Sequence, residues 1–348
     1  MTEPRVIDGG VTEPAREGLH LDHEHGRSLR IRYGERELTR YVYEPWDPQL
    51  ESPRPYFHPV RTLRGDVVSL YRPHDHVWHK GIAWSVANVG AGRVADDPPQ
   101  ENFWGGTTFV RGTGYQQLEN DGAMRHREFT RLDASREHVD VAHGLDWLTQ
   151  DGRRWVDEVR EFAITVGPVG IPAGESAADT TVGPAAWVLT FGTRMTNVSG
   201  HYLTFGSPTT QGRENAGYGG LFWRGPRSFT GGTVYAPGTS GGDELMGTRS
   251  PWLGLSGVHD EHGRASTLVF IDDPANAQHP TQWFVRSQMF ACVCPAPFFN
   301  TEIEVAPDES IERRYAVVVA DGDPGADGAE GLAKLGFDAL ASSDLGAF

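Results

Sequence analysis

Three histidines lie within six positions in the run Pro73-His-Asp-His-Val-Trp-His-Lys-Gly81, a dense group of chemically versatile side chains. In an extended segment His74 and His76 would project to one face, because alternate residues of a strand share a face. Paired imidazoles of this kind can hold a divalent transition metal. An imidazole also titrates near neutral pH, so His76 and His79 are candidates for general acid or base work, or for hydrogen bonding to sugar hydroxyls.

The metal interpretation lacks a ligand. A cupin-like site would place a glutamate about four residues after the second histidine, and Lys80 occupies that place. We therefore expect no cofactor, and one divalent transition metal held by His74, His76 and His79 is the alternative. A structural role, in which these histidines hydrogen-bond a loop, also stays open.

A second polar group stands in the glycine-rich run 206–225, where Arg213, Glu214 and Asn215 follow one another. Such a run is poor material for a strand or helix, and shaped loops on a rigid scaffold often carry sites. Arg213 can clamp a carboxylate or diol oxygens, Asn215 can hold an oxygen, and Glu214 can act as a base or metal ligand. The structural alternative is a surface connection with an Arg–Glu ion pair.

Aromatic rings beside polar groups suit sugars, because rings stack on C–H faces while hydroxyls need polar partners. The further substrate-binding candidates of this kind are His58, Asn102, Trp104, Trp223 and His279. Each indole is also a candidate for the hydrophobic core.

The elements that must position these residues are mainly strands. Apolar and charged residues alternate over 28–33, and Trp187, Leu189, Phe191 and Met195 alternate with smaller or polar residues. Helical patterning is confined to the end of the chain. We predict an all-β fold, a large two-sheet antiparallel β-sandwich with few short helices. Its expected parts are an N-terminal tail over 1–26, one sandwich domain over 27–322, and a covering helix and tail over 323–348.

Composition excludes several function classes. Against 47 Asp and Glu there are 31 Lys and Arg, and the formal charge of −16 would repel a nucleic acid backbone. No run approaches the roughly 18 uncharged apolar residues of a membrane-spanning helix, and the N-terminus lacks the pattern of a signal peptide. The two cysteines are too few for a disulfide framework, so a cytoplasmic protein without membrane contact is expected.

The succession of several motifs resembles the PmoA-like family of bacterial proteins, over residues 28–322. The motifs are Arg54-Pro-Tyr-Phe-His-Pro59, Asp75-His76 with His79-Lys-Gly81, Asn102-Phe-Trp-Gly105, the run 213–227 and the closing run 307–319. The resemblance implies a sugar-related role and a functional link to a sugar dehydrogenase. The strand density also looks like the two-sheet sandwich of galactose mutarotases, in which a histidine and a glutamate act across the sugar ring. By that analogy His76, His79 and Glu214 are the expected catalytic residues.

These observations predict a carbohydrate-active protein that acts on a sugar or keto-sugar derivative. Its expected chemistry is proton transfer of the epimerase, lyase or hydrolase type. Two alternatives stay open, a metal-dependent oxidoreductase that uses the histidine cluster and a non-catalytic carbohydrate-binding protein. No sequence pattern indicates the oligomeric state.

Overall fold

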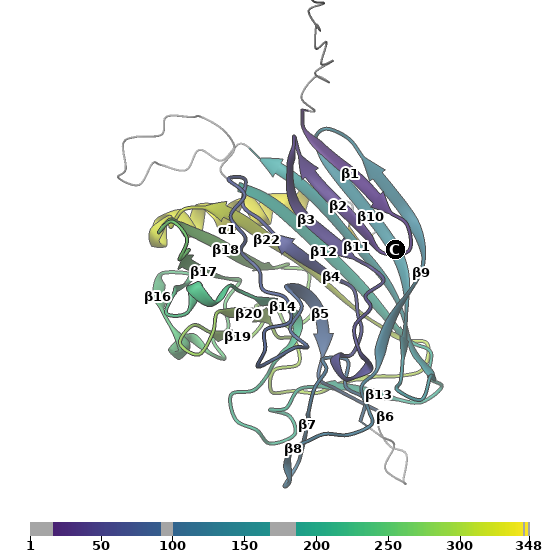
Figure 1. The fold of residues 1–348 in the computed structure, drawn as a ribbon. Coiled ribbons are helices and arrows are strands. Elements are labelled where there is room, and N and C mark those ends of the chain that lie inside the picture. The colour runs from purple at the N-terminus through teal and green to yellow at the C-terminus, as the bar shows by residue number, and fades with distance from the viewer. Residues whose placement is uncertain (1–16, 92–99, 168–185, 344, 347–348) are drawn as a thin grey trace, which may run out of the picture.

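The computed structural model describes residues 17–91, 100–167, 186–343 and 345–346. In that part of the chain two large antiparallel sheets pack face to face as a β-sandwich (Figure 1). None of the described helices is long and apolar enough to cross a membrane. The prediction of an all-β, two-sheet antiparallel sandwich is confirmed.

The first sheet has eight strands among the described residues. Their spatial order is β1 (Leu19–Glu24), β2 (Ser28–Tyr33), β3 (Arg36–Val42), β4 (Tyr56–Val60), β5 (Ile82–Val86), β14 (Gly219–Arg224), β20 (Cys292–Pro295) and β19 (Trp283–Arg286). The order jumps from β5 to β14, so segments far apart in the sequence meet at this end of the sheet.

The second sheet has nine strands among the described residues. Their order is β16 (Thr239–Gly241), β15 (Thr233–Ala236), β17 (Trp252–Val258), β18 (Ala265–Asp272), β22 (Ser310–Asp321), β12 (Ala186–Asn197), β11 (Arg154–Gly167), β10 (His138–Leu148) and β9 (Ala123–Ala134).

Small elements complete the described fold. They are the sheet β21 (Ile303–Val305), β13 (Leu203–Gly206) and β6 (Asn88–Ala91), the hairpin β7 (Thr108–Val110) and β8 (Gly114–Gln116), the 3-10 turns η1 (Gln49–Glu51), η2 (Arg227–Phe229) and η3 (Asp243–Leu245), and the helix α1 (Gly325–Ser342).

The main core fills the space between the two large sheets. On β12, Trp187, Leu189 and Phe191 point into this core, whereas the intervening Val188 belongs to a second apolar cluster on the opposite face. Burial of apolar surface on both faces explains why the strand carries so few charges.

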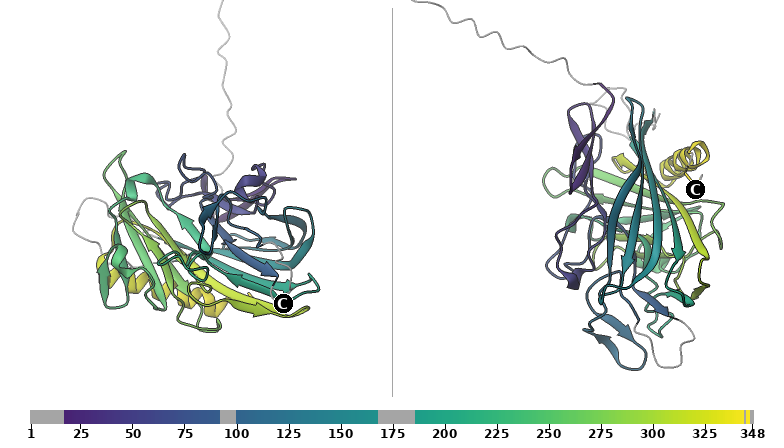
Figure 2. Two further views of the ribbon diagram at one scale, coloured as in Figure 1. Left: turned by 90° about the horizontal axis from the view of Figure 1, so that it is seen from below. Right: turned by 90° about the vertical axis from the view of Figure 1, so that its right-hand side faces the viewer.

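Helix α1 lies on the outer face of the nine-stranded sheet, away from the eight-stranded sheet (Figure 2). Its buried residues Leu332 and Leu340 share the outer cluster with Val318 of β22. The helix lies within the segment 323–348, for which the sequence predicts a covering helix and a tail. The side chain of Asp323 accepts a hydrogen bond from the Gly325 amide at 3.0 Å, at the point where the helix begins.

The expected boundary between the N-terminal tail and the sandwich requires a correction. Residues 19–24 form β1, which pairs with β2 from Leu19↔Tyr33 to Glu24↔Ser28. The alternation of His20, Asp22 and Glu24 with Leu19 and Leu21 is that of an edge strand, with charge on one side. The sandwich therefore begins with a strand inside the segment 1–26, which is predicted from the sequence to be a tail.

Candidate functional site

A cavity of about 320 Å³ lies beside β14 and β19. These strands belong to the end of the eight-stranded sheet where β5, β14, β20 and β19 are neighbours (Figure 1). Its walls come from segments that are far apart in the sequence. The lining residues are His76, Trp78, His79, Trp104, Gly105, Thr107, Tyr115, Arg213, Tyr218, Phe222, Phe284, Arg286, Met289 and Phe290.

Strand alternation places the cavity on the outer face of the sheet. In β14, Leu221 and Trp223 belong to the core between the sheets, whereas Phe222 belongs to a separate aromatic cluster with Phe284 and Phe290. The indole of Trp223 is fully buried and donates a hydrogen bond to the Val68 carbonyl at 2.7 Å. The expectation that Trp223 binds substrate is corrected, because its neighbour Phe222 lines the cavity instead.

The histidine segment forms consecutive turns and is not extended. The amide of His76 donates to the Pro73 carbonyl at 3.0 Å, and the amide of His79 donates to the His76 carbonyl at 2.9 Å. The rings of His76 and His79 therefore stack, with centroids 4.8 Å apart and planes inclined by 20°. His74 is exposed outside the cavity, and its Nδ1 lies 3.5 Å from Arg227.

Two anchors hold the histidine segment against the sheet. The buried ammonium of Lys80 pairs with the carboxylates of Asp47, at 3.1 Å, and Glu51. Gly81 follows with φ of 64°, and a Cβ at this position would lie 2.2 Å from the Phe57 carbonyl oxygen. Because only glycine fits, the chain can turn there directly into β5.

Burial disfavours the charged form of both cavity histidines. Burial lowers the pKa of His76, against the opposing effect of Asp75, whose Oδ2 lies 3.4 Å from the His76 Nδ1. The pKa of His79 is well below its ordinary value because the ring is completely buried and His76 and Arg224 are close. Asp75 itself is held by Arg227 at 2.6 Å. A neutral imidazole with a carboxylate behind it is suited to accept a proton.

An aromatic wall is built around Trp104. The Asn102 Oδ1 accepts hydrogen bonds from the amides of Trp104, at 2.9 Å, and Gly105, at 3.0 Å. The Trp104 ring then contacts Tyr218 and Phe222, with centroid distances of 4.6 and 4.7 Å. Asn102 is buried and shapes this wall without lining the cavity, so the structure gives it a supporting place.

Arg213 belongs to a hydroxyl-rich part of the wall. Its guanidinium donates to the Tyr115 hydroxyl, which lies 2.9 Å from the Tyr218 hydroxyl. The next residues, Glu214 and Asn215, are exposed in the following turn and are not among the lining residues. The structure therefore brings His76, His79, Trp104 and Arg213 together but does not add Glu214 or Asn215.

Two other predicted residues lie elsewhere. His279 is bound through Nδ1 to the buried Asp272, at 2.8 Å, outside the cavity. His58 lines a different hollow of about 330 Å³, and its Nδ1 lies 2.9 Å from the Ser69 hydroxyl.

Sequence reasoning missed several cavity residues, namely Tyr115, Tyr218, Phe222, Phe284, Arg286 and Phe290. Phe222 lies in an apolar strand segment in which alternation does not tell the core face from the cavity face, so its place in the cavity had no local signal. Arg286 and Phe290 lie in and after a short strand whose outer face cannot be recognised from its own residues.

The described residues form no group of side chains that converges on a metal position. Across the described residues, no three or more His, Cys, Asp or Glu side chains are grouped as they would be around one ion. A metal at His74, His76 and His79 would require the exposed His74 to move toward the other two rings. That alternative stays a prediction, and metal analysis of protein purified without chelator tests it.

The environment of His58 predicts a pH effect on stability. Burial, with Arg61 and Arg40 nearby, lowers the pKa of His58 to about 4. Since the unfolded value is higher, this group contributes stability that is present above about pH 6.5 and is lost as the pH falls through about 4. We expect the His58 ring to titrate in NMR with a midpoint near pH 4. In His58→Gln, the free energy of unfolding should fall less steeply than in the wild type between about pH 6.5 and about pH 4. A midpoint near 6.5 would contradict the prediction.

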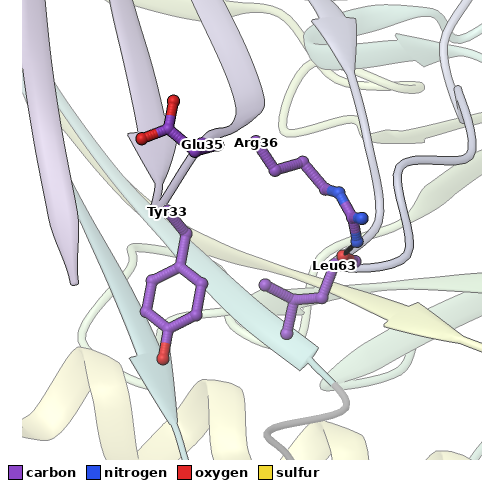
Figure 3. A pocket seen from close by; sticks show the side chains of 4 residues that line it. All are labelled: Tyr33, Glu35, Arg36 and Leu63. Atoms are coloured by element: carbon purple, nitrogen blue, oxygen red, sulfur yellow. Dashed lines mark hydrogen bonds between the residues drawn. The ribbon is translucent and has the colours of Figure 1, made fainter. Parts of the chain in front are cut away.

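A larger hollow of about 470 Å³ lies at the turn between β2 and β3 (Figure 3). Its lining residues are Tyr33, Glu35, Arg36 and Leu63, and the Arg36 guanidinium donates to the Leu63 carbonyl. The hollow has no histidine and few converging polar groups. Chemistry therefore favours the smaller aromatic cavity as the functional site.

Comparison of the sequence with models of known protein families finds a match to one family. The profile of the family described as "Family of unknown function (DUF6807)" matches residues 28–334. No curated protein matches the sequence. The resemblance to the PmoA-like family stays an expectation.

Several solved structures are similar at low identity. The α-galactosidase AgaB of Geobacillus stearothermophilus is 12% identical, with a TM-score of 0.39, over 87% of this chain and 41% of its own. The galactose 1-epimerase of Lactobacillus acidophilus NCFM is 8% identical, with a TM-score of 0.39, over 89% of this chain and 100% of its own. The chain thus spans about 40% of the α-galactosidase. These values are too low to transfer an activity or a residue's role.

Proposed function

The chain belongs to DUF6807, a family of unknown function, and we propose that its cavity binds a sugar or a keto-sugar derivative and transfers a proton on it. The observation that carries the proposal is the neutral, half-buried His76 beside the aromatic wall of Trp104 and Phe222. Ring faces can stack on the C–H face of a sugar, while the Tyr115 and Tyr218 hydroxyls and Arg213 provide hydrogen bonds to its oxygens.

In this proposal His76 is the group that exchanges the proton. It accepts a proton from a hydroxyl, or from a carbon next to a carbonyl, and Asp75 stabilises the imidazolium that forms. Epimerisation follows if the intermediate turns over in the cavity before the imidazolium returns the proton, so that the proton reaches the other face of the carbon. Elimination follows if a neighbouring hydroxyl group leaves as water with the proton from the imidazolium. Glu214 has no part in this step, since it is exposed outside the cavity. His79 stacks behind His76 and positions its ring.

A non-catalytic sugar-binding protein is the second candidate. One observation favours it, namely that no Asp or Glu lines the cavity, so that no carboxylate is placed there for proton transfer. A keto-sugar ligand would arise from oxidation of a sugar hydroxyl, and a sugar dehydrogenase is the class of enzyme that would supply it.

The test is a panel of aldoses and 3-keto-sugars, with binding followed by tryptophan fluorescence and turnover by proton NMR in D₂O. We expect binding by at least one sugar, with incorporation of deuterium at the reacting carbon. Trp104→Leu should weaken binding roughly tenfold, because a stacked aromatic face is lost. The matched control is Trp46→Leu, since Trp46 is 83% exposed and lines a different hollow.

Each outcome has a defined meaning. Binding without deuterium incorporation or turnover favours the non-catalytic candidate. Absence of binding across the panel, or equal effects of Trp104→Leu and Trp46→Leu, contradicts the proposal.

A further inference from the structure

Arg224, the last residue of β14, is a buried cation without a polar partner. Its side chain is fully buried, and none of its three guanidinium nitrogens has a hydrogen-bond partner among the described residues. Strand alternation places it on the same face as Phe222, which lines the cavity. Its Cζ lies 3.7 Å from the ring centroid of Phe290, another lining residue.

Such an arrangement is costly for the free protein. A buried charge that lacks a partner destabilises the folded state, and a guanidinium needs several acceptors to be satisfied. Burial lowers the pKa of Arg224 to about 10, so the group is still charged at neutral pH. The carboxylate of Asp75 raises the pKa of Arg224 through its charge, but it is already paired with Arg227 at 2.6 Å.

A second arginine reinforces the positive charge at this place. Both Arg224 and Arg286 pair in register with Cys292, from opposite sides of β20. They therefore lie on the same face of three adjacent strands. Two strand spacings separate their Cα atoms, which corresponds to about 10 Å. Arg286 lines the cavity, and no carboxylate is present among the lining residues. The protein carries a formal charge of −16, yet none of the guanidinium nitrogens of Arg224 has a hydrogen-bond partner among the described residues, and no described carboxylate lines the cavity beside Arg286.

The guanidinium of Arg224 needs acceptor atoms that no described residue provides. The Arg224 guanidinium lies over the ring of Phe290, and its buried N–H groups have no acceptor among the described residues. A guanidinium can donate to two acceptor oxygens of one anion through its fork of N–H groups. We propose that the ligand of the cavity is an acidic sugar, whose anionic oxygens accept hydrogen bonds from Arg224 and are attracted by Arg286. This inference rests on the proposed sugar-binding function and specifies its substrate class.

The experiment compares matched ligands that differ only in the anionic group. Binding of galactose, galacturonate and galactose 6-phosphate is measured by calorimetry with the wild type, Arg224→Met and Arg286→Met. Arg36→Met, at the hollow of Figure 3, is the charge-matched control. Thermal unfolding of each variant is recorded, and Arg224→Met should be at least as stable as the wild type, because methionine removes the unpaired charge.

We expect the wild type to bind an acidic sugar at least tenfold more tightly than galactose, because one hydrogen-bonded ion pair contributes about this factor to an affinity. Arg224→Met should abolish this preference, Arg286→Met should reduce it, and Arg36→Met should keep it. A preference for galacturonate assigns a carboxylate, and a preference for galactose 6-phosphate assigns a phosphate ester. Either result supports the anion site.

Other outcomes separate this inference from the proposed function. Tight binding of galactose without preference for an acid overturns the acidic ligand and leaves the sugar site intact. If no sugar binds, glycerate is compared with glycerol by thermal shift. Stabilisation by glycerate that is lost in Arg224→Met then supports an anion site without a sugar, and absence of stabilisation overturns the inference.

Discussion

Replacing His76 by alanine is expected to lower the turnover of the sugar ligand by about 10²–10⁴-fold, the usual loss when a positioned acid or base is removed. The ring lines the cavity with Asp75 behind it, and its pKa is lowered by burial, so at neutral pH the wild type presents a free base. Alanine offers no group for the proton. Binding of the ligand should change far less than turnover, because the aromatic wall of Trp104 and Phe222 is unaffected.

The pH profile gives an independent measurement of the same role. A base whose pKa lies below the ordinary 6.5 loses activity only as the pH falls below that value, so the acid limb of kcat/KM should lie under pH 6.5. His201→Ala is the control, because His201 is exposed and does not line the cavity. Turnover by His76→Ala at the wild-type rate, with a normal melting temperature, would exclude His76 as the proton-transfer group.

The second large effect concerns the core between the sheets. Glu158 and Arg160 of β11 form a completely buried ion pair, with Nε–Oε1 at 2.7 Å and Nη2–Oε2 at 2.9 Å. The Glu158 carboxylate also accepts hydrogen bonds from the Trp147 indole at 2.6 Å and the Thr193 hydroxyl at 2.8 Å. Glu158→Ala leaves the Arg160 charge buried without its partner, and we expect a loss of about 3–5 kcal/mol in the free energy of unfolding.

Urea denaturation measures this loss. The matched control is Lys334→Ala, which breaks the exposed pair of Lys334 with Asp338 on α1 and should leave the midpoint unchanged. The double variant Glu158→Leu with Arg160→Met should recover most of the stability, because it removes both charges together. A loss below about 1 kcal/mol in Glu158→Ala would show that water or another group replaces the carboxylate.

Part of the candidate site was predictable from local sequence. The histidine segment and the 206–225 run were recognised by their composition, and His76, His79 and Arg213 from them do line one cavity. The inference failed to exclude Glu214, which directly follows Arg213 but is exposed in a turn. Neighbouring residues of a loop point in different directions, and only the loop's contacts with the rest of the protein decide which of them faces a cavity.

The sequence by itself determined the class of fold. Alternating apolar residues such as Trp187, Leu189 and Phe191 bury one strand face whatever the topology, and the apolar spacing near the C-terminus specifies a helix. It also determined that polar and aromatic groups suited to sugar chemistry are present.

Only the tertiary structure decided how these groups combine. The choice between Phe222 and Trp223 as the cavity residue depends on which face of β14 meets the second sheet, and alternation alone leaves both faces equivalent. The pairing of β14 with β20 joins residues more than 60 positions apart, and the local pairing of β19 with β20 then places Arg286 on the same face as Arg224. Such long-range pairing arises from the collective burial of apolar surface in the whole chain, and so no local segment encodes the positive charge beside the cavity.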